Sequence, residues 1–236
     1  MGDWIVEQIT KTFITEDRYK LFIQGFTNTM IIVFAAAIIG VILGILVAVV
    51  RVSHSQNDKP NFILKLMNKI CSFYLAIFRG TPIIVQLMII YYIVFLNAGI
   101  HNRLIAAIVG FGFNSGAYVA EIVRAGIMAV DKGQTEAGRS LGFSSVVTMR
   151  LIILPQAIKN ILPALGNEFI TLIKETAVAG TISVMDFTMA ADSVRIRTMD
   201  ALFPLLFVAL VYFIIIWIFT KSLGVLERRM RKGDNR

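Results

Sequence analysis

Charged residues are scarce in this sequence: Asp, Glu, Lys and Arg together make up 16% of its 236 residues. A water-soluble domain carries about 25% of such residues and is about 45–50% apolar, whereas 57% of the residues here are hydrophobic. The single cysteine, Cys71, excludes an internal disulfide, and 5 prolines and 17 glycines leave no room for a collagen-like chain or long flexible linkers. These shortages indicate a polytopic membrane protein rather than a disordered, fibrous or disulfide-rich secreted chain.

Long apolar runs divide the sequence. A helix that crosses a bilayer needs about 20 mostly apolar residues, at a rise of about 1.5 Å per residue. Five stretches qualify: residues 22–50, 82–96, 104–128, 161–185 and 201–226. The second is short, and the pattern leaves open a start further back, within residues 73–78. The sequence therefore predicts an all-α integral membrane protein with five transmembrane helices.

Short segments flank these spans. Before them, Ile5, Ile9 and Phe13 recur at every fourth residue, a spacing typical of a short helix in the headgroup plane of the membrane. Residues 1–21 are therefore expected to form an N-terminal interfacial segment, with a disordered polar tail as the alternative. Residues 22–226 are expected to form the transmembrane domain, and residues 227–236 a basic cytoplasmic tail.

The Lys and Arg residues are distributed unevenly around the spans. If the N-terminus is outside, the outer segments hold six of the 23 basic residues and the inner segments and helix ends hold sixteen, while Lys174 lies inside the fourth span. Cytoplasmic segments carry the excess of Lys and Arg. We therefore expect an extracytoplasmic N-terminus, a cytoplasmic C-terminus and an inner side attracted to anionic lipids. The net charge of +8 is thus a membrane signal, and no motif for nucleic-acid binding accompanies it.

The segment between the third and fourth spans, residues 129–160, is too ordered in pattern for a linker. Residues 134–141 are typical of a short helix that Gly142 ends, because glycine is favoured just past a helix terminus. Ser144 is a candidate N-cap for a second helix that runs towards Leu154, where we expect Pro155 to interrupt it. A helix–glycine–helix loop has a fixed shape, which suits docking to a partner.

The loop also carries a recognisable spacing, and other stretches match around it. It has Glu136, Ala137 and Gly138, then Gly142 after three residues, and Ile152-x-Leu154-Pro155 after nine more. This pattern resembles the EAA signature of ABC-importer permeases, with glycine in the third position, where alanine is commoner. Four further stretches resemble the polar amino-acid branch of that family: GFTNTM at 25–30, FRGTPIIVQ at 78–86, AYVAEIVRAGI at 117–127 and LPALGNEFITLIKETA at 162–177.

The resemblance, which covers most of residues 20–226, implies the ABC type I importer permease fold in the bacterial cytoplasmic membrane. It implies a second permease chain, identical or paralogous, two cytoplasmic ATPase subunits and an extracytoplasmic solute-binding protein as partners. It also implies that the loop is a coupling helix, through which ATP-driven closure of the ATPases alternates the permease between inward-facing and outward-facing states.

The expected coupling residues are Glu136, Ala137, Gly138, Arg139 and Gly142. For two of them an alternative stands: Glu136 caps the short helix and Arg139 is only solvated. The sequence contains no GxxxxGK[ST] phosphate loop. ATP and Mg²⁺ are therefore expected on the partner ATPase, with no cofactor, metal site or enzymatic activity in this chain.

Two predicted spans carry polar stripes. Asn114, Tyr118 and Glu121 recur at i, i+4 and i+7, and Asn167, Thr171 and Lys174 repeat that spacing, with Glu175 alongside. Polar groups in a span are costly and usually face a wet interior, so these seven residues are expected to line a pathway for a polar amino acid. Alternatively, Glu121 and Lys174 form a buried pair and the fourth-span stripe joins helices. Arg79 and Arg124 are expected to be interface anchors.

The charges at membrane depth bear on the substrate. Glu121, Glu168 and Glu175 outnumber Lys174, which favours a basic amino acid, with glutamine or another polar solute as the alternative.

A membrane enzyme would need paired aspartates, a Ser–Lys dyad or a histidine-rich metal site, yet no predicted span contains Asp and the two histidines fall on opposite sides. A channel gives no reason for the rigid loop.

Overall fold

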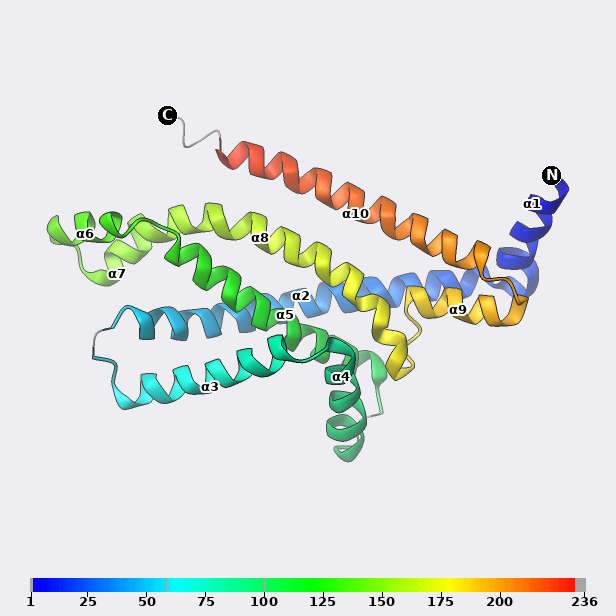
Figure 1. The fold of residues 1–236 in the computed structure, drawn as a ribbon, viewed down its shortest axis with the longest axis horizontal. Helices are drawn as coiled ribbons and strands as arrows, with labels where there is room; N and C mark the ends of the chain where they lie inside the picture. The colour runs from blue at the N-terminus through cyan, green and yellow to red at the C-terminus, as the bar shows by residue number, and fades with distance from the viewer. Residues whose placement is uncertain (1, 58, 100, 232–236) are drawn as a thin grey trace. The chain divides into compact units, whose positions relative to one another are not determined.

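The computed structural model describes residues 2–57, 59–99 and 101–231, and within these ranges the chain forms helices and no strand (Figure 1). The α-helices are α1 (Gly2–Ile9), α2 (Tyr19–Ser55), α3 (Phe62–Gly80), α4 (Ile83–Met88), α5 (Arg103–Met128), α6 (Lys132–Ser140), α7 (Ser145–Thr148), α8 (Leu154–Glu175), α9 (Phe187–Thr198) and α10 (Leu202–Arg231). Short π-helical and 3-10 segments extend them: η1 (Thr10–Ile14), η2 (Thr15–Asp17), η3 (Ile89–Phe95), η4 (Met149–Ile153) and η5 (Thr176–Ile182).

Four helical stretches are long and apolar enough to cross a membrane: Tyr19–Ser55, Arg103–Met128, Ser145–Ile182 and Leu202–Met230. The pair Phe62–Gly80 and Ile83–Phe95 makes a fifth if its two arms form one span. The second predicted span therefore corresponds only to the second arm of this pair. The break lies at Thr81–Pro82, where the Gln86 amide donates hydrogen bonds to the carbonyl and the hydroxyl of Thr81 (both 2.9 Å).

Pro155 does not interrupt the second loop helix, and that expectation is wrong. Ser144 is the N-cap, accepting a hydrogen bond from the Val147 N–H (3.3 Å), but the helical path then continues through η4 and α8 to Ile182. Pro155 is the second residue of α8, directly after the π-helical turn. Proline, which lacks a backbone N–H, is tolerated in the first turn of a helix.

Contacts divide the chain into two compact units, each built from three separate stretches. Unit 1 comprises the described residues of Met1–Ile38, Thr81–Gly112 and Ile170–Thr220. Unit 2 comprises those of Ile39–Gly80, Phe113–Phe169 and Lys221–Arg236.

In unit 1 the start of α2 is fastened to the turn that precedes α9. The Asn28 amide donates to the Met185 carbonyl (2.9 Å), and the Thr29 hydroxyl accepts from the Phe187 N–H (3.0 Å). A Cβ on Gly25 would lie 2.6 Å from the Asp186 carbonyl oxygen. The stretch GFTNTM thus packs α2 directly against the backbone of this turn.

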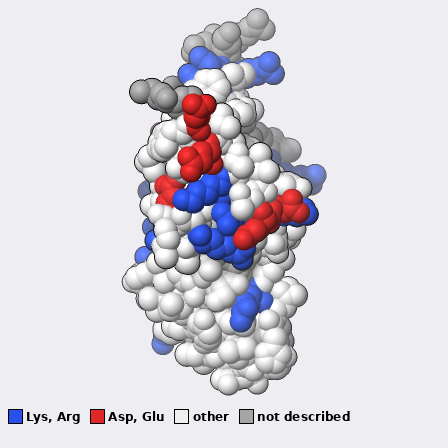
Figure 2. Space-filling view, turned by 90° about the vertical axis from the view of Figure 1, so that its right-hand side faces the viewer, with Lys and Arg blue, Asp and Glu red and all other residues white. Residues whose placement is uncertain are grey.

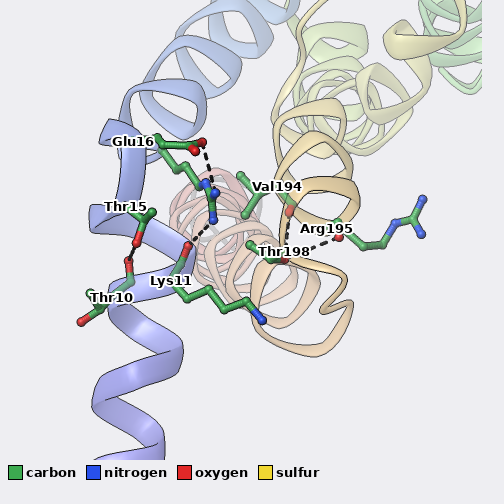
Figure 3. A network of polar contacts seen from close by, with 8 residues as sticks. Thr10, Lys11, Thr15, Glu16, Val194, Arg195 and Thr198 are labelled. Atoms are coloured by element: carbon green, nitrogen blue, oxygen red, sulfur yellow. Dashed lines mark hydrogen bonds and ion pairs between the residues drawn. The ribbon is translucent and has the colours of Figure 1, made fainter.

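The N-terminal segment of unit 1 is folded against neighbouring helices. Phe13 packs edge-on against Phe207 at 4.8 Å between ring centroids, and Trp4 against Phe203 at 5.4 Å. The buried Arg18 donates to the Lys11 carbonyl (2.7 Å) and to Glu16 (3.1 Å), as Figure 3 shows beside the hydroxyl bonds of Thr198. This end of the protein carries interspersed acidic and basic side chains rather than a field of one sign (Figure 2).

Unit 2 packs three helical segments closely. A Cβ on Gly44 would lie 2.5 Å from Val119 Cγ1, so α2 approaches α5 at a distance that only glycine allows. The helix α3 runs beside the end of α2 (Figure 1), joined to it by the Arg51 guanidinium, and it reaches α5 through the Tyr74 hydroxyl, which donates to the Phe113 carbonyl (2.6 Å).

Candidate functional site

A cavity of about 520 Å³ opens in unit 2 among α2, α3 and α5. Its lining combines charged and polar groups with a few small apolar ones: Arg51, Ser72, Leu75, Ala76, Arg79, Gly80, Tyr118 and Glu121. The volume falls within the range of about 300–1,000 Å³ that is typical of small-molecule sites. Charged side chains around a hollow between membrane-spanning helices make it the first candidate for a substrate site.

Two arginines compensate the acidic residue of this cavity. Arg124 donates to Glu121 through Nε (3.1 Å) and also through Nη2, one helical turn along α5. The Arg79 guanidinium lies 3.8 Å from the same carboxylate and 5.7 Å from the centre of the Tyr118 ring. Glu121 therefore has ion-pair partners within unit 2.

The third lining cation, Arg51, is held differently. Its Nη1 donates to the Ser72 hydroxyl (2.6 Å) and to the Asn68 side-chain oxygen (3.1 Å), both on α3. Its Nε is buried and has no hydrogen-bond partner in the part of the chain that the structure describes. Arg51 is thus positioned by neutral oxygens rather than by a carboxylate.

The first polar stripe is only partly brought to this cavity. Tyr118 and Glu121 line it, whereas Asn114 is buried and donates to the Phe78 carbonyl (3.2 Å). That bond fastens α5 to the end of α3. Asn114 therefore shares the helix face of Tyr118 and Glu121 but serves the packing beside them.

The second stripe lies on α8 and is partly open to the surface of the protein. Asn167 and Lys174 are exposed, and Thr171 and Glu175 are half-buried. Asn167 belongs to unit 2, and the other three residues belong to unit 1.

Sequence reasoning missed Arg51 as a site residue and treated Arg79 only as an anchor. A usable signal was present: Asn68, Ser72 and Arg79 recur at i, i+4 and i+11, which places them on one helix face. That face went unnoticed because residues 62–80 lay outside every predicted span.

The loop between the third and fourth predicted spans forms a compact helical hairpin. The helix α6 starts at Asp131, whose carboxylate accepts from the Gly133 N–H (2.7 Å), and ends before Gly142, which has a φ of +85°. The Gly142 N–H donates to the Arg139 carbonyl (3.0 Å) and the Phe143 N–H to that of Gly138 (3.2 Å). This pair of bonds is the Schellman arrangement, whose left-handed position favours glycine.

Gly138 explains why the third position of the motif is small. It is buried on a helix that is otherwise exposed, and a Cβ there would lie 2.7 Å from Thr148 Cγ2 and 2.9 Å from Ile152 Cδ1. The absence of a side chain lets α6 lie directly on α7 and η4.

The outer surface of the hairpin exposes several large apolar side chains, which is unusual for a segment that connects two membrane spans. Leu141, Val146 and Leu151 are 74%, 76% and 61% exposed, and Phe143 is also exposed. Arg139 is exposed and donates to the Phe143 carbonyl (2.8 Å), and the N-cap of α6 is Asp131 rather than Glu136. Glu136 lines a second cavity, of about 410 Å³, together with residues of α6, α7 and the ends of α2 and α5. Exposed apolar side chains on a rigid hairpin are typical of an interaction surface.

Comparisons with known proteins agree with these features. The sequence profile of the binding-protein-dependent transport system inner membrane component matches residues 40–232, and the chain belongs to this family. It is therefore a multi-pass component of a transport system in the bacterial inner membrane.

Two named relatives illustrate the similarity. The putative glutamine transport system permease protein GlnP of Rickettsia typhi is 39% identical over 212 residues, which cover 88% of this chain and 92% of that protein. The arginine transport system permease protein ArtQ of Bacillus subtilis is 40% identical over 221 residues, which cover 93% of this chain and 97% of that protein.

Solved structures share the fold. A chain of an amino acid ABC transporter crystallised with histidines matches with a TM-score of 0.81 and 41% identity, over 92% of this chain and 98% of that one. A chain of the inward-facing MetNI methionine ABC transporter matches with a TM-score of 0.75 over 89% of this chain and 96% of that one, at 22% identity. The fold is that of ABC importer permeases.

Proposed function

We propose that this chain is the transmembrane permease subunit of an ATP-driven importer for polar amino acids. The observation that carries the proposal is the cavity of unit 2, where Arg51, Arg79, Tyr118 and Glu121 gather between membrane-spanning helices. Charged groups in such helices are costly unless they face water or a ligand. A polar amino acid, which carries both an ammonium and a carboxylate, is a ligand of matching chemistry.

The stripe on α8 supports a second part of the proposal, the pairing with another permease chain. Asn167 and Lys174 are exposed within the candidate span Ser145–Ile182. Lipid cannot satisfy an amide or an ammonium group at this depth. We propose that this face of α8 borders a water-filled pathway completed by the second chain, identical or paralogous.

The hairpin supports the ATPase partners. Its exposed apolar residues Leu141, Val146 and Leu151 surround the motif residues, and Gly138 and Gly142 fix its shape. We propose that a cytoplasmic ATPase receives this surface and that ATP and Mg²⁺ bind there rather than to this chain. Closure of the two ATPases would then move the hairpins and alternate the access of the pathway.

The expected orientation of the chain in the membrane indicates where a binding protein would dock. With the N-terminus outside, as the excess of basic residues on the opposite side favours, an extracytoplasmic binding protein would deliver the substrate to the face that carries α1 and α9. The relatives are named for glutamine and for arginine. We therefore propose a basic amino acid or glutamine as the substrate.

The test begins with purification of the tagged chain from its native membrane in mild detergent and mass spectrometry of the proteins that accompany it. A P-loop ATPase in near-equal amount is expected, and a second permease sequence would establish a heterodimer. The complex is then reconstituted with its binding protein, and ATP-dependent uptake of labelled arginine, lysine, histidine and glutamine is measured. Uptake that does not require ATP would contradict the proposal.

A further inference from the structure

We propose that Arg51 binds the α-carboxylate of the transported amino acid, in the cavity that it lines with Arg79, Tyr118 and Glu121. The inference rests on the proposed function and adds to it a specific anchoring residue. It applies equally to a basic amino acid and to glutamine, because both carry the same α-carboxylate.

The charge balance of the cavity favours an anionic ligand group. The one acidic group in its lining, Glu121, is paired with Arg124 and lies 3.8 Å from Arg79. Arg51 has no carboxylate within ion-pair distance among the residues that the structure describes. Arginine keeps its positive charge in proteins. The cavity therefore holds an excess of positive charge, which an anionic group of a ligand would neutralise.

The Arg51 side chain is also held in a fixed orientation. Ser72 and Asn68 accept from one terminal nitrogen, Nη1, and the Ser72 hydroxyl in turn donates to the Asn68 carbonyl (2.8 Å). These bonds fix the plane of the guanidinium, while Nε remains without a partner. A guanidinium offers five N–H donors in a rigid fork that matches a carboxylate. Arg51 is thus oriented in advance, and its second terminal nitrogen, Nη2, which makes no hydrogen bond within the described residues, is left for a ligand.

The neighbouring arginines differ from Arg51 in their partners. Arg79 and Arg124 are both within ion-pair distance of the Glu121 carboxylate, and the Arg79 guanidinium also lies over the Tyr118 ring. The single Glu121 carboxylate is thus shared between these two arginines. Arg51, in contrast, is positioned by neutral oxygens alone. Among the arginines that line the cavity, it therefore gains most from an ion pair with a ligand's carboxylate.

The experiment uses the complete permease–ATPase complex in nanodiscs and compares each amino acid with the amine that lacks its carboxylate. Binding of L-arginine and agmatine is measured by calorimetry, or of L-glutamine and 4-aminobutyramide if glutamine is the substrate. For the wild type we expect a preference of about tenfold or more for the amino acid, as a charge-assisted hydrogen bond provides. For Arg51→Gln we expect this preference to disappear, with the affinity for the amine unchanged.

Three further variants make the test decisive. Ser72→Ala keeps the charge of Arg51 but removes one of its supports, and we expect it to reduce the preference partially. Arg51→Lys keeps the charge without the fork and serves if Arg51→Gln fails to assemble; we expect it to reduce the preference as well. Lys69→Gln removes a neighbouring exposed cation of α3 that does not line the cavity, and should leave the preference as in the wild type.

The outcomes separate the possible sources of the anion. An Arg51→Gln complex that still prefers the amino acid as the wild type does would overturn the inference. If that variant instead changes only the dependence of activity on phosphatidylglycerol, Arg51 binds a lipid phosphate and the inference is also overturned. A wild-type complex that takes up no amino acid with any binding protein would contradict the proposed function itself.

Discussion

Gly138 and Thr148 lie so close that a methyl group on the glycine would stand 2.7 Å from Cγ2 of the threonine. Thr148 is buried and β-branched, so its side chain has little freedom to move aside. The third position of the motif therefore determines how closely α6 packs on α7, and with it the shape of the proposed ATPase-docking surface.

This contact predicts an interaction between two substitutions. Gly138→Ala should reduce the amount of substrate taken up per ATP hydrolysed, because the hairpin must open to admit the methyl group. Thr148→Ser removes Cγ2, so we expect the double variant to recover most of the loss. Uptake and ATP hydrolysis measured together in proteoliposomes check this. Equal effects of Gly138→Ala with and without Thr148→Ser would show that the contact does not matter.

Gly142 gives a prediction based on backbone conformation alone. Nothing lies within 4 Å of a Cβ at this position, but its φ is +85°. Gly142→Val should therefore strain the turn by about 1–2 kcal/mol and uncouple ATP hydrolysis from uptake without preventing membrane insertion. Gly142→Asn serves as the control, since asparagine adopts this conformation more easily. Normal uptake by the valine variant would remove the support for a rigid coupling turn.

Glu121 provides a test of the cavity. Glu121→Gln leaves Arg79 and Arg124 without their carboxylate partner, and we expect uptake to fall by about tenfold or more while the complex still assembles. Assembly is followed by size-exclusion chromatography and uptake by labelled substrate. Loss of assembly would instead mean that the Glu121 ion pairs serve the fold.

The exposed stripe on α8 predicts a difference in water accessibility. In a Cys71→Ser background, Lys174→Cys and Asn167→Cys should react with a membrane-impermeant thiol reagent, because their face borders the proposed aqueous pathway. Leu162→Cys is the matched control: Leu162 is also exposed on α8 but lies on a different face. Faster labelling at position 162 than at 167 and 174 would place lipid where we propose water.

Asp186 predicts a dependence of stability on pH. It lies just before α9, outside the candidate spans, and burial raises its pKa from 3.8 to about 6, opposed by hydrogen bonds from the N–H groups of Met189, Gly180 and Thr188. The folded state then binds more protons than the unfolded state between about pH 4 and 6. The free energy of unfolding should fall as pH rises through that window, by at most about 3 kcal/mol, and stay level above it.

Thermal unfolding of the detergent-solubilised complex at pH 4.5, 5.5 and 7 measures this slope. Asp186→Asn, which cannot titrate, should remove the part of the slope that lies below pH 6. A slope unchanged by that substitution would assign the dependence to other groups.

Local chemistry made some features predictable from the sequence. Glycine at a left-handed position and serine at a helix start act through their own backbone neighbours, so Gly142 and Ser144 were assigned correctly. The long apolar runs likewise revealed α2, α5 and α10. The predicted interruption at Pro155 was wrong, because the effect of this proline depends on the π-helical turn before it, which no sequence pattern indicated.

Features that depend on distant parts of the chain were not predictable. Lys65, Lys69 and Arg79 interrupt the apolar character of α3, so its sequence did not predict part of a membrane span. Without α3 beside α2, nothing indicated that Arg51 meets Ser72. Asn114 shared a face with Tyr118, yet only the position of the Phe78 carbonyl decides that it is buried.

The division into two units has a consequence for biosynthesis. Each unit draws on an early, a middle and a late stretch of the chain, and the late stretches, Ile170–Thr220 and Lys221–Arg236, follow one another at the end. Unit 1 cannot complete its core while the ribosome is still making the loop hairpin, because Gly25, Asn28 and Thr29 of α2 pack against the turn before α9, which is made later. The second half of nascent α2 can pack against α3 and α5 at this stage, whereas its first half lacks α9.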